Sequence, residues 1–236
     1  MVTVVLPVYN ERDNLAPLMA EIAASLASIP YETVAVDDGS TDGSLEALQA
    51  LRATYPGLRI VAFARNAGQS AAFAAGFAAA RGDVVVTMDA DGQNDPADVP
   101  RLLAALDGPA HPAAAVGVRT NRADTAWRRL QSRVANACRN RITGDHVQDT
   151  GCSLKAMRRG ALAALPRFDG MHRFLPSLIR LGGGTVVEVA VRHRPRRAGR
   201  SRYGMWNRVW RGLVDALGVR WLRRRRLQYV IREEIE

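Results

Sequence analysis

The 236-residue chain, 47% of it hydrophobic, is long enough for one large α/β domain with a substantial core. Its two cysteines, Cys138 and Cys152, exclude a disulfide framework, and without a cluster of His or Cys at ligand spacing they do not indicate zinc, so we expect buried thiols. No apolar run is long enough to span a membrane, and no leader-like segment precedes the first predicted strand, so we expect a cytoplasmic protein.

The net charge of +10 is distributed unevenly along the sequence. Residues 1–118 contain 14 acidic residues and 6 arginines, whereas residues 119–226 contain 25 arginines and one lysine against 6 acidic residues. An acidic half followed by a basic half predicts a polyanionic partner, such as phosphate groups, an anionic membrane surface or nucleic acid.

Two apolar segments near the start of the chain predict strands, at residues 2–8 and 33–36. The first ends in Tyr9-Asn10-Glu11 and is followed by a predicted helix over residues 13–26. The second ends in residues 37–43, where two glycines permit a tight loop before a helix that reaches about residue 53.

The third and fourth predicted strands, residues 58–63 and 83–88, also end in polar loops. The third leads into a helix of small residues, 70–80, that can pack closely on a sheet. The fourth ends in Asp89-Ala90-Asp91-Gly92-Gln93, where two carboxylates one residue apart can both face one hard divalent cation, Mg²⁺ or Mn²⁺. The alternative is a polar turn before a helix that starts near Pro96.

Strands that alternate with helices predict a mostly parallel sheet with right-handed crossovers. In open sheets of this kind, ligands bind beyond the carboxyl ends of the strands. We therefore expect the loops at residues 9–11, 37–38, 66–69 and 89–93 to line one cleft.

The arginine-rich half begins with a predicted strand over residues 113–118, and Arg119 follows at its end. A helix is predicted over residues 124–141, with Asp149-Thr150-Gly151 on the loop beyond it. A further strand, residues 185–191, leads into residues 193–204, which are rich in Arg, Gly and Pro and are expected to be mobile without a ligand.

The last predicted helix covers residues 205–229. Its tryptophans and leucines recur at intervals of three and four residues, with arginines on the other faces. This composition is typical of a helix in a membrane interface, and the alternative is a helix docked on the protein's own core. The residues of the predicted apolar face are Trp206, Trp210, Leu213, Leu217 and Trp221.

With these loops in their order, the chain resembles the inverting family 2 glycosyltransferases of the dolichyl- and polyprenyl-phosphate sugar synthase type, which have a GT-A fold. The resemblance spans nearly the whole chain and is carried by residues 6–11, 37–43, 65–69, 89–93, 149–152 and 200–204. It implies a Rossmann-like, mostly parallel sheet flanked by helices. The implied domain covers residues 1–204, with a nucleotide-sugar and metal half to residue 118 and an acceptor half from residue 119, followed by an amphipathic interfacial helix and tail over residues 205–236.

The resemblance also implies roles for single residues. The nucleotide pocket is expected to be lined by Pro7, Tyr9, Glu11 and Asp38, with Asp37 in support. The donor-binding set further includes Gly68, Gln69 and Ala90, and the metal and diphosphate are expected to lie among Asp89, Asp91 and Gln93. The acceptor phosphate is expected in a cage formed by Arg119, Arg133, Ser201 and Arg202.

The function implied by the resemblance is metal-dependent transfer of a sugar, with inversion, from a GDP- or UDP-linked donor to polyprenyl phosphate at the cytoplasmic face of the membrane. Attachment there is left to the final helix or to a membrane partner protein. Asp149 is open between a base toward a hydroxyl acceptor, a group that orients the acceptor phosphate, and a holder of an arginine. Transfer to a hydroxyl of a glycan or lipid is therefore the alternative, and a non-catalytic polyanion- or membrane-binding module is less favoured because the Asp-x-Asp loop is intact. Nucleic acid is not expected as a partner, since no RNA-binding signature is present.

Overall fold

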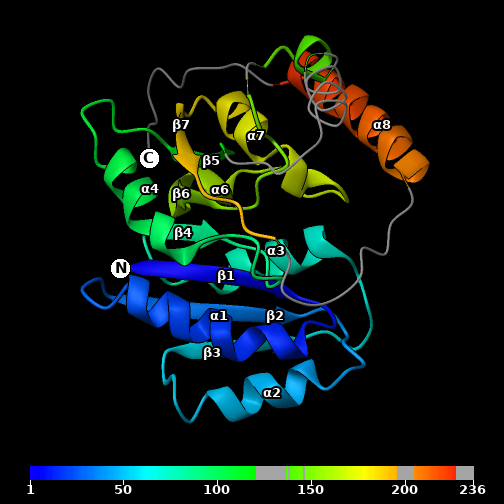
Figure 1. Cartoon of the computed structure of the whole chain (residues 1–236). Helices are drawn as coiled ribbons and strands as arrows, with labels where there is room; N and C mark the ends of the chain where they lie inside the picture. The colour runs from blue at the N-terminus through cyan, green and yellow to red at the C-terminus, as the bar shows by residue number, and fades with distance from the viewer. Residues whose placement is uncertain (121–136, 138, 146, 196–204, 227–236) are drawn as a thin grey trace, which may run out of the picture.

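A seven-stranded sheet forms the centre of the protein (Figure 1), with the strand order β3-β2-β1-β4-β6-β5-β7. The computed structural model describes residues 1–120, 137, 139–145, 147–195 and 205–226, and the side chains of its last helix from Gly212 onward. Neighbouring strands are parallel except at β6, which is antiparallel to both β4 and β5. The predicted mostly parallel sheet is confirmed.

The first half of the chain follows the predicted alternation of strands and helices, with boundaries that differ by one or two residues. Its elements are β1 (Val2–Val8), α1 (Arg12–Ser25), β2 (Tyr31–Asp37), α2 (Ser44–Leu51), β3 (Leu58–Ala62), α3 (Gln69–Ala79) and β4 (Val84–Thr87).

The rest of the chain contains predicted elements and, between residues 155 and 181, four elements that were not predicted. Its elements are η1 (Pro96–Asp98), α4 (Val99–Leu106), β5 (Ala114–Arg119), β6 (Lys155–Arg158), α6 (Arg159–Ala163), η2 (Met171–Arg173), α7 (Leu175–Leu181), β7 (Val186–Val191) and α8 (Met205–Arg224). Strand β6 was missed because it has four residues, none of them β-branched, with a charged residue at each end. Most of the helix predicted over residues 124–141 lies outside the described residues.

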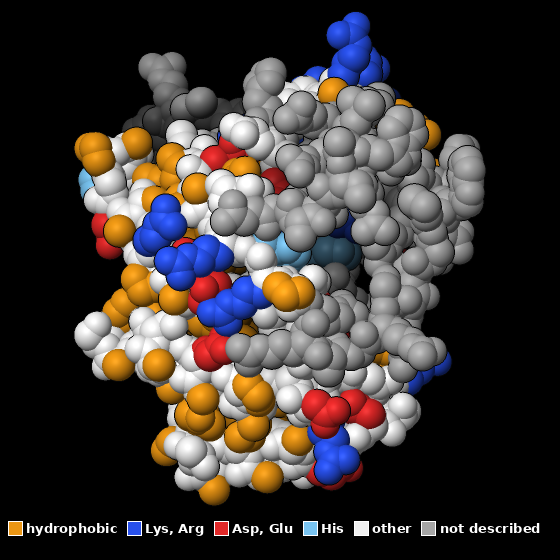
Figure 2. Space-filling view, in the orientation of Figure 1, with side chains coloured by type: hydrophobic (Ala, Val, Ile, Leu, Met, Phe, Trp, Pro, Cys, Tyr) orange, Lys and Arg blue, Asp and Glu red, His pale blue; other side chains and the backbone are white. Residues whose placement is uncertain are grey.

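Arginines of the basic half form ion pairs with carboxylates of the acidic half. Arg194 contacts Asp95 at 2.6 Å and Glu21 at 2.7 Å, and Arg192 lies 3.7 Å from Asp95. On the face of the molecule drawn in Figure 2, basic and acidic side chains of the described residues lie side by side. The two halves therefore share one sheet and also contact each other through charge pairs. The division at residue 118 stays a prediction about function.

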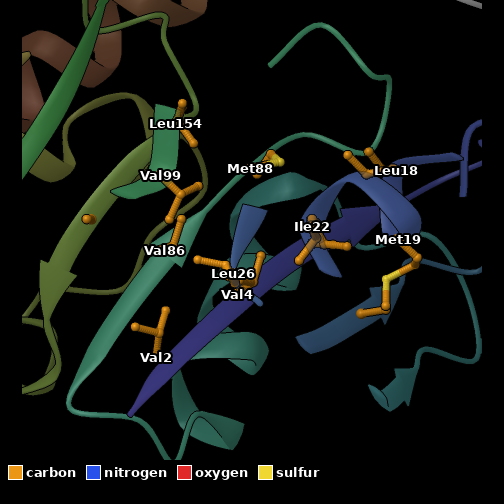
Figure 3. Close-up of a cluster of buried hydrophobic side chains, with 14 of the residues drawn as sticks. Val2, Val4, Leu18, Met19, Ile22, Leu26, Val86, Met88, Val99 and Leu154 are labelled. Carbon is orange, nitrogen blue, oxygen red and sulfur yellow. The ribbon is translucent and has the colours of Figure 1, made fainter. Parts of the chain in front are cut away.

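Alternate side chains of the central strands enter two different cores, as the period of a strand requires. Val4 of β1 and Val86 of β4 pack with Ile22 of α1 and with Leu26, which follows α1, on one face (Figure 3). Val5 and Val85 face the other side, with residues of α3, α6 and α7. On that side a Cβ at Gly76 would overlap the side chain of Val5, so the predicted close approach of the small-residue helix is confirmed.

Helix α8 docks on a third, smaller cluster of buried residues through part of its surface only. Ala216 and Val219 are buried with Met171, Phe174 and Leu178. Other apolar side chains of α8 stay exposed, from 39% to 60%; they are Leu213, Val214, Leu217 and Trp221. Among the described residues, no helix combines the length and the apolar character needed to cross a bilayer. Cys152 is buried as expected, and Cys138 lies outside the described residues.

Candidate active site

The polar loops predicted to converge do lie at one edge of the sheet. In the parallel register Val8 of β1 is opposite Asp37 of β2, and Asp37 is opposite Ala62 of β3. Thr87, the last residue of β4, is opposite Val5 of β1. The loops that follow these four strands therefore leave the sheet in the same direction and form one site.

The loop after β1 is held by the loop after β2. The backbone N–H groups of Asn10 and Glu11 donate to the hydroxyls of Ser40 and Ser44, each at 3.0 Å. Asn10 adopts a positive φ of 58°, which asparagine tolerates better than most residues. These bonds fix the backbone immediately after Tyr9, whose side chain is exposed.

The carboxylate of Asp38 accepts three hydrogen bonds from the loop that follows β3. Oδ1 accepts from Ala67 N at 2.6 Å, and Oδ2 accepts from Gly68 N and from Asn66 Nδ2, each at 2.9 Å. The loops approach so closely that a Cβ at Gly39 would lie 2.6 Å from backbone. Asp38 therefore positions the neighbouring loop, and a direct contact with a nucleotide stays a prediction.

Asp37 is 2% exposed, and its two carboxylate oxygens differ in their surroundings. Oδ2 accepts from the backbone N–H of Ser40 at 3.2 Å, whereas Oδ1 has no hydrogen-bond partner among the described residues. A buried carboxylate oxygen is costly without a donor, so Asp37 suits a ligand that supplies an N–H or O–H group. Pro7, one residue before the end of β1, lies on the neighbouring strand and is half-buried.

Asp89 and Asp91 follow β4 directly, as predicted. Gln69, the first residue of α3, donates from Nε2 to Asp89 Oδ1 at 2.7 Å. Oδ1 of Asp91 accepts from the backbone N–H of Gln93 at 3.1 Å, which closes the bend. Ala90, between the two acids, is buried in the core and anchors the loop. The carboxylates of Asp89 and Asp91 lie on either side of this anchor in the sequence.

The chemistry of this pair fits a divalent cation. Burial, and then the charge of Asp91, raise the pKa of the Asp89 carboxyl, so its ionised form is unfavourable without a counter-charge. A cation beside both carboxylates would supply that charge. The described part of the chain contains no group of three or more His, Cys, Asp or Glu placed to hold a metal.

Arg119 at the end of β5 holds Asp149 in a bidentate ion pair. Nε donates to Oδ2 at 2.7 Å and Nη2 donates to Oδ1 at 2.8 Å. Burial opposes the charge of Arg119, but the hydrogen bonds and charge of Asp149 raise its pKa overall. Both oxygens of Asp149 are thus engaged by the guanidinium, which is the third of the three roles left open for Asp149.

Lys155 on β6 belongs to the site and was not predicted. It is 2% exposed, its ammonium donates to the carbonyl oxygen of Cys152, and its charge acts on Asp89. Burial lowers its pKa, opposed by the negative groups around it. One signal was available: Lys155 is the single lysine among 33 basic residues, and it lies between apolar residues.

Three predicted acceptor residues, Arg133, Ser201 and Arg202, lie outside the described residues. The structure therefore brings together the donor-side residues, Arg119 and Asp149, and the phosphate cage stays a prediction.

Comparison with known proteins agrees with this arrangement. A model of the family described as "Glycosyl transferase family 2" matches residues 3–165, which is more than half of the chain. The chain belongs to glycosyl transferase family 2. The family predicted from the motifs is confirmed.

Curated relatives of this chain are transferases that act with polyprenyl phosphates. It is 39% identical over 223 residues to dodecaprenyl-phosphate galacturonate synthase of Rhizobium johnstonii, and the match covers 92% of this chain and 65% of that protein. It is 41% identical over 209 residues to undecaprenyl-phosphate 4-deoxy-4-formamido-L-arabinose transferase of Edwardsiella ictaluri, covering 86% and 63%. The chain thus spans slightly less than two thirds of the length of these relatives.

Solved structures share the fold at lower identity. Glucosyl-3-phosphoglycerate synthase of Mycobacterium tuberculosis, in complex with Mn²⁺, UDP and glucosyl-3-phosphoglycerate, has a TM-score of 0.70 and 23% identity, covering 92% of this chain and 80% of that one. A mannosyltransferase of Pyrobaculum calidifontis, in complex with GDP-mannose and Mn²⁺, has a TM-score of 0.63 and 20% identity, covering 94% and 73%. The predicted GT-A fold is confirmed.

Proposed function

We propose that the protein transfers a sugar from a nucleoside-diphosphate sugar to polyprenyl phosphate. The observation that carries the acceptor is the Arg119–Asp149 pair. Because both oxygens of Asp149 accept hydrogen bonds from Arg119, the carboxylate serves to orient the Arg119 guanidinium rather than to remove a proton. A phosphate oxygen is ionised at neutral pH and needs no base. The polyprenyl-phosphate relatives support the same acceptor.

On the donor side, the nucleotide lies beyond β1 and β2, where Asp37 offers a buried acceptor oxygen beside Pro7, Tyr9 and Glu11. Asp89 and Asp91, with Gln93, would hold a divalent cation, Mg²⁺ or Mn²⁺, together with the diphosphate. When bound, this cation stabilises the negative charge that develops on the departing diphosphate. Solved structures of the same fold contain Mn²⁺ with UDP or with GDP-mannose, which supports a divalent metal and leaves both bases open.

The transfer is a single displacement at the anomeric carbon. An oxygen of the acceptor phosphate forms the new bond to this carbon as the bond to the diphosphate oxygen breaks, and the electron pair leaves with the nucleoside diphosphate. Attack from the face opposite the leaving group inverts the anomeric centre. The arginines of the acceptor half, Arg119 here and Arg133 and Arg202 by prediction, hold two anionic reactants together.

The reaction is tested with purified protein, Mn²⁺, a panel of radiolabelled sugar nucleotides and undecaprenyl phosphate, by counting label in the organic phase. We expect metal-dependent label from one donor and its loss, by at least about a hundredfold, in Asp91→Asn, since a direct metal ligand is removed. Asp83→Asn, which changes an exposed carboxylate just before β4, at the opposite edge of the sheet, is the control. Label that enters the organic phase equally well without a divalent metal contradicts the proposal.

A second part of the proposal concerns the membrane surface. The exposed side chains of Leu213, Val214, Leu217 and Trp221 on α8 are followed by four exposed arginines, residues 223–226. Apolar side chains flanked by arginines match the interface of an anionic bilayer, where the acceptor's phosphate is also found. We therefore place the protein peripherally on the inner face of the membrane, with a membrane partner protein as the alternative means of attachment.

Leu217→Glu tests this placement. It puts a charge in the exposed apolar face, and we expect co-sedimentation with phosphatidylglycerol-containing vesicles to weaken by at least about tenfold, because burial of one leucine contributes about 1.5–3 kcal/mol. Ala50→Glu makes the same charge change on α2 and is expected to bind normally. Equal binding of both variants and the wild type would reject α8 as the contact.

A further inference from the structure

Asn94 connects three segments of the site although none of the predicted roles includes it. The residue is 3% exposed and lies just after the Asp89–Gln93 loop. Its side-chain oxygen Oδ1 accepts from the backbone N–H of Asp89 at 3.1 Å and from the hydroxyl of Ser153 at 2.7 Å. One amide oxygen thus holds the start of the metal loop and a residue of the segment that carries Asp149.

Ser153 ends the acceptor-side turn, which we define as residues 149–153. Its carbonyl oxygen accepts from the hydroxyl of Thr87, the last residue of β4, at 2.6 Å. The turn is therefore attached to β4 at Thr87 and to the loop after β4 through Asn94.

The backbone of Asn94 contacts a third segment. It forms an isolated antiparallel bridge with His193, and the next residue, Arg194, donates from its backbone N–H to Gln93 O at 2.9 Å. The N–H of Arg192 donates to Asp98 at 2.7 Å. Residues 192–195 come directly before the segment in which Ser201 and Arg202 are predicted to bind the acceptor phosphate.

We propose that Asn94 is a positioning residue that couples the Asp89–Gln93 loop to the acceptor-side turn and to residues 192–195. The inference rests on the proposed function, because it assigns the coupling to binding of metal and nucleotide at that loop. Coupling of this kind is transmitted through contiguous hydrogen bonds, and the response of each coupled segment has to be measured directly. Asn94 touches no reactant in this role, so the measurement has to follow the segments themselves.

Hydrogen exchange of the full chain, with and without Mn²⁺ plus a mixture of UDP and GDP, follows the three segments separately. In the wild type we expect these ligands to slow exchange at residues 89–93, 149–153 and 192–195. In Asn94→Ala we expect protection at saturating ligand to remain at 89–93 and at 192–195, because the backbone bridge to His193 is kept, and to be lost at 149–153. The affinity for Mn²⁺ alone, measured by electron paramagnetic resonance, is expected to fall about tenfold, because the Asp89 N–H loses its acceptor.

Ser153→Ala separates the two branches and serves if Asn94→Ala does not fold. It removes one partner of Asn94 Oδ1 and leaves the backbone bridge to His193, so we expect protection to be lost at residues 149–153 and kept at 192–195. Ser177→Ala, which removes a buried hydroxyl bonded to Asp145, is the matched control and is expected to transmit protection like the wild type.

Ligand protection that reaches residues 149–153 unchanged in Asn94→Ala or in Ser153→Ala overturns the coupling and leaves the proposed function intact. A wild type that binds neither Mn²⁺ nor nucleotide overturns the proposed function, and the coupling with it.

Discussion

Asp149 and Arg119 are joined by two hydrogen bonds of 2.7 and 2.8 Å between a largely buried carboxylate and a half-buried guanidinium. Pairs of this geometry orient both partners, and removal of one leaves the other charge poorly compensated. The role of this pair distinguishes the two candidate acceptors. With a phosphate acceptor Asp149 orients an arginine, whereas with a hydroxyl acceptor Asp149 would act as base.

Asp149→Asn is predicted to lower kcat/KM for polyprenyl phosphate about ten- to a hundredfold, mainly through a higher KM, because the loss of a charged hydrogen bond costs about 1.5–3 kcal/mol. The pH dependence of kcat should not change. Arg119→Lys keeps the positive charge but cannot make both hydrogen bonds to Asp149, so it should also raise KM more than it lowers kcat. A kcat that falls to background in Asp149→Asn while KM stays unchanged would instead support a base.

His172 gives a prediction about stability and pH. Burial, followed by the charges of Arg173 and Lys155, lowers the pKa of His172 from 6.5 to about 3, and Nδ1 lies 2.7 Å from the hydroxyl of Ser70. Below pH 6.5 the unfolded chain binds a proton that the folded protein excludes. Stability is therefore lost as pH falls from 6.5 toward 3, by up to about 1.4 kcal/mol per pH unit.

Urea unfolding of the wild type and of His172→Gln at a series of pH values from about 7 to 4 measures this loss. The free energy of unfolding of the variant should fall less steeply with decreasing pH. Parallel curves for the two proteins would show that His172 does not contribute.

At the residue scale, the sequence indicated which side chains end the strands because each follows an apolar run. It did not indicate their partners. The bonds from Asp38 to residues 66–68 join groups about thirty residues apart, and they depend on loop paths that no local pattern specifies. The same holds for Asn94 and Ser153, which are ordinary polar residues until the fold brings them together.

At the scale of elements, α3 lies so close to β1 that residue 76 has no room for a side chain. In an open helix position Gly→Ala stabilises by about 0.5–1 kcal/mol, whereas overpacking a core costs about 1–3 kcal/mol. We predict that Gly76→Ala lowers the free energy of unfolding by about 1–2 kcal/mol, the overlap with Val5 outweighing the gain in propensity.

Gly218→Ala is the matched control, because a Cβ at this exposed position of α8 meets nothing within 4 Å. It should be neutral or stabilising. Urea denaturation of both variants makes the comparison, and a Gly76→Ala protein as stable as the control would contradict the close packing.

Element prediction succeeded where pattern and burial agreed. Strands β1 to β4 are apolar runs with polar ends, and their parallel order follows from the intervening helices. Strand β6 was not predicted because its strand conformation depends on pairing with β4 and β5. Its buried Lys155 is stabilised by negative charges from other segments. Of the apolar face predicted for α8 from its spacing, Leu213, Leu217 and Trp221 are exposed, and the side chains of Trp206 and Trp210 lie outside the described residues. The docking face of α8, Ala216 and Val219, was not predicted.

At the scale of the whole molecule, the charge asymmetry seen in the sequence becomes an arrangement around one sheet. The acidic half supplies the loops after β1 to β4, and the basic half supplies Arg119 at the end of β5, which is separated from β4 by β6. Where the halves meet, Arg192 and Arg194 pair with acids of the first half. An anionic donor and an anionic acceptor are therefore expected to meet between a cation held by carboxylates and a set of guanidinium groups.

The most direct test of this account is phosphorus NMR of undecaprenyl phosphate incubated with the protein, Mn²⁺ and the sugar nucleotide that the labelling panel identifies. The account predicts that the phosphomonoester signal of the lipid is replaced by a phosphodiester signal while nucleoside diphosphate accumulates. Consumption of the sugar nucleotide with the lipid phosphomonoester left unchanged would contradict it, because the sugar would then have gone to a hydroxyl or to water.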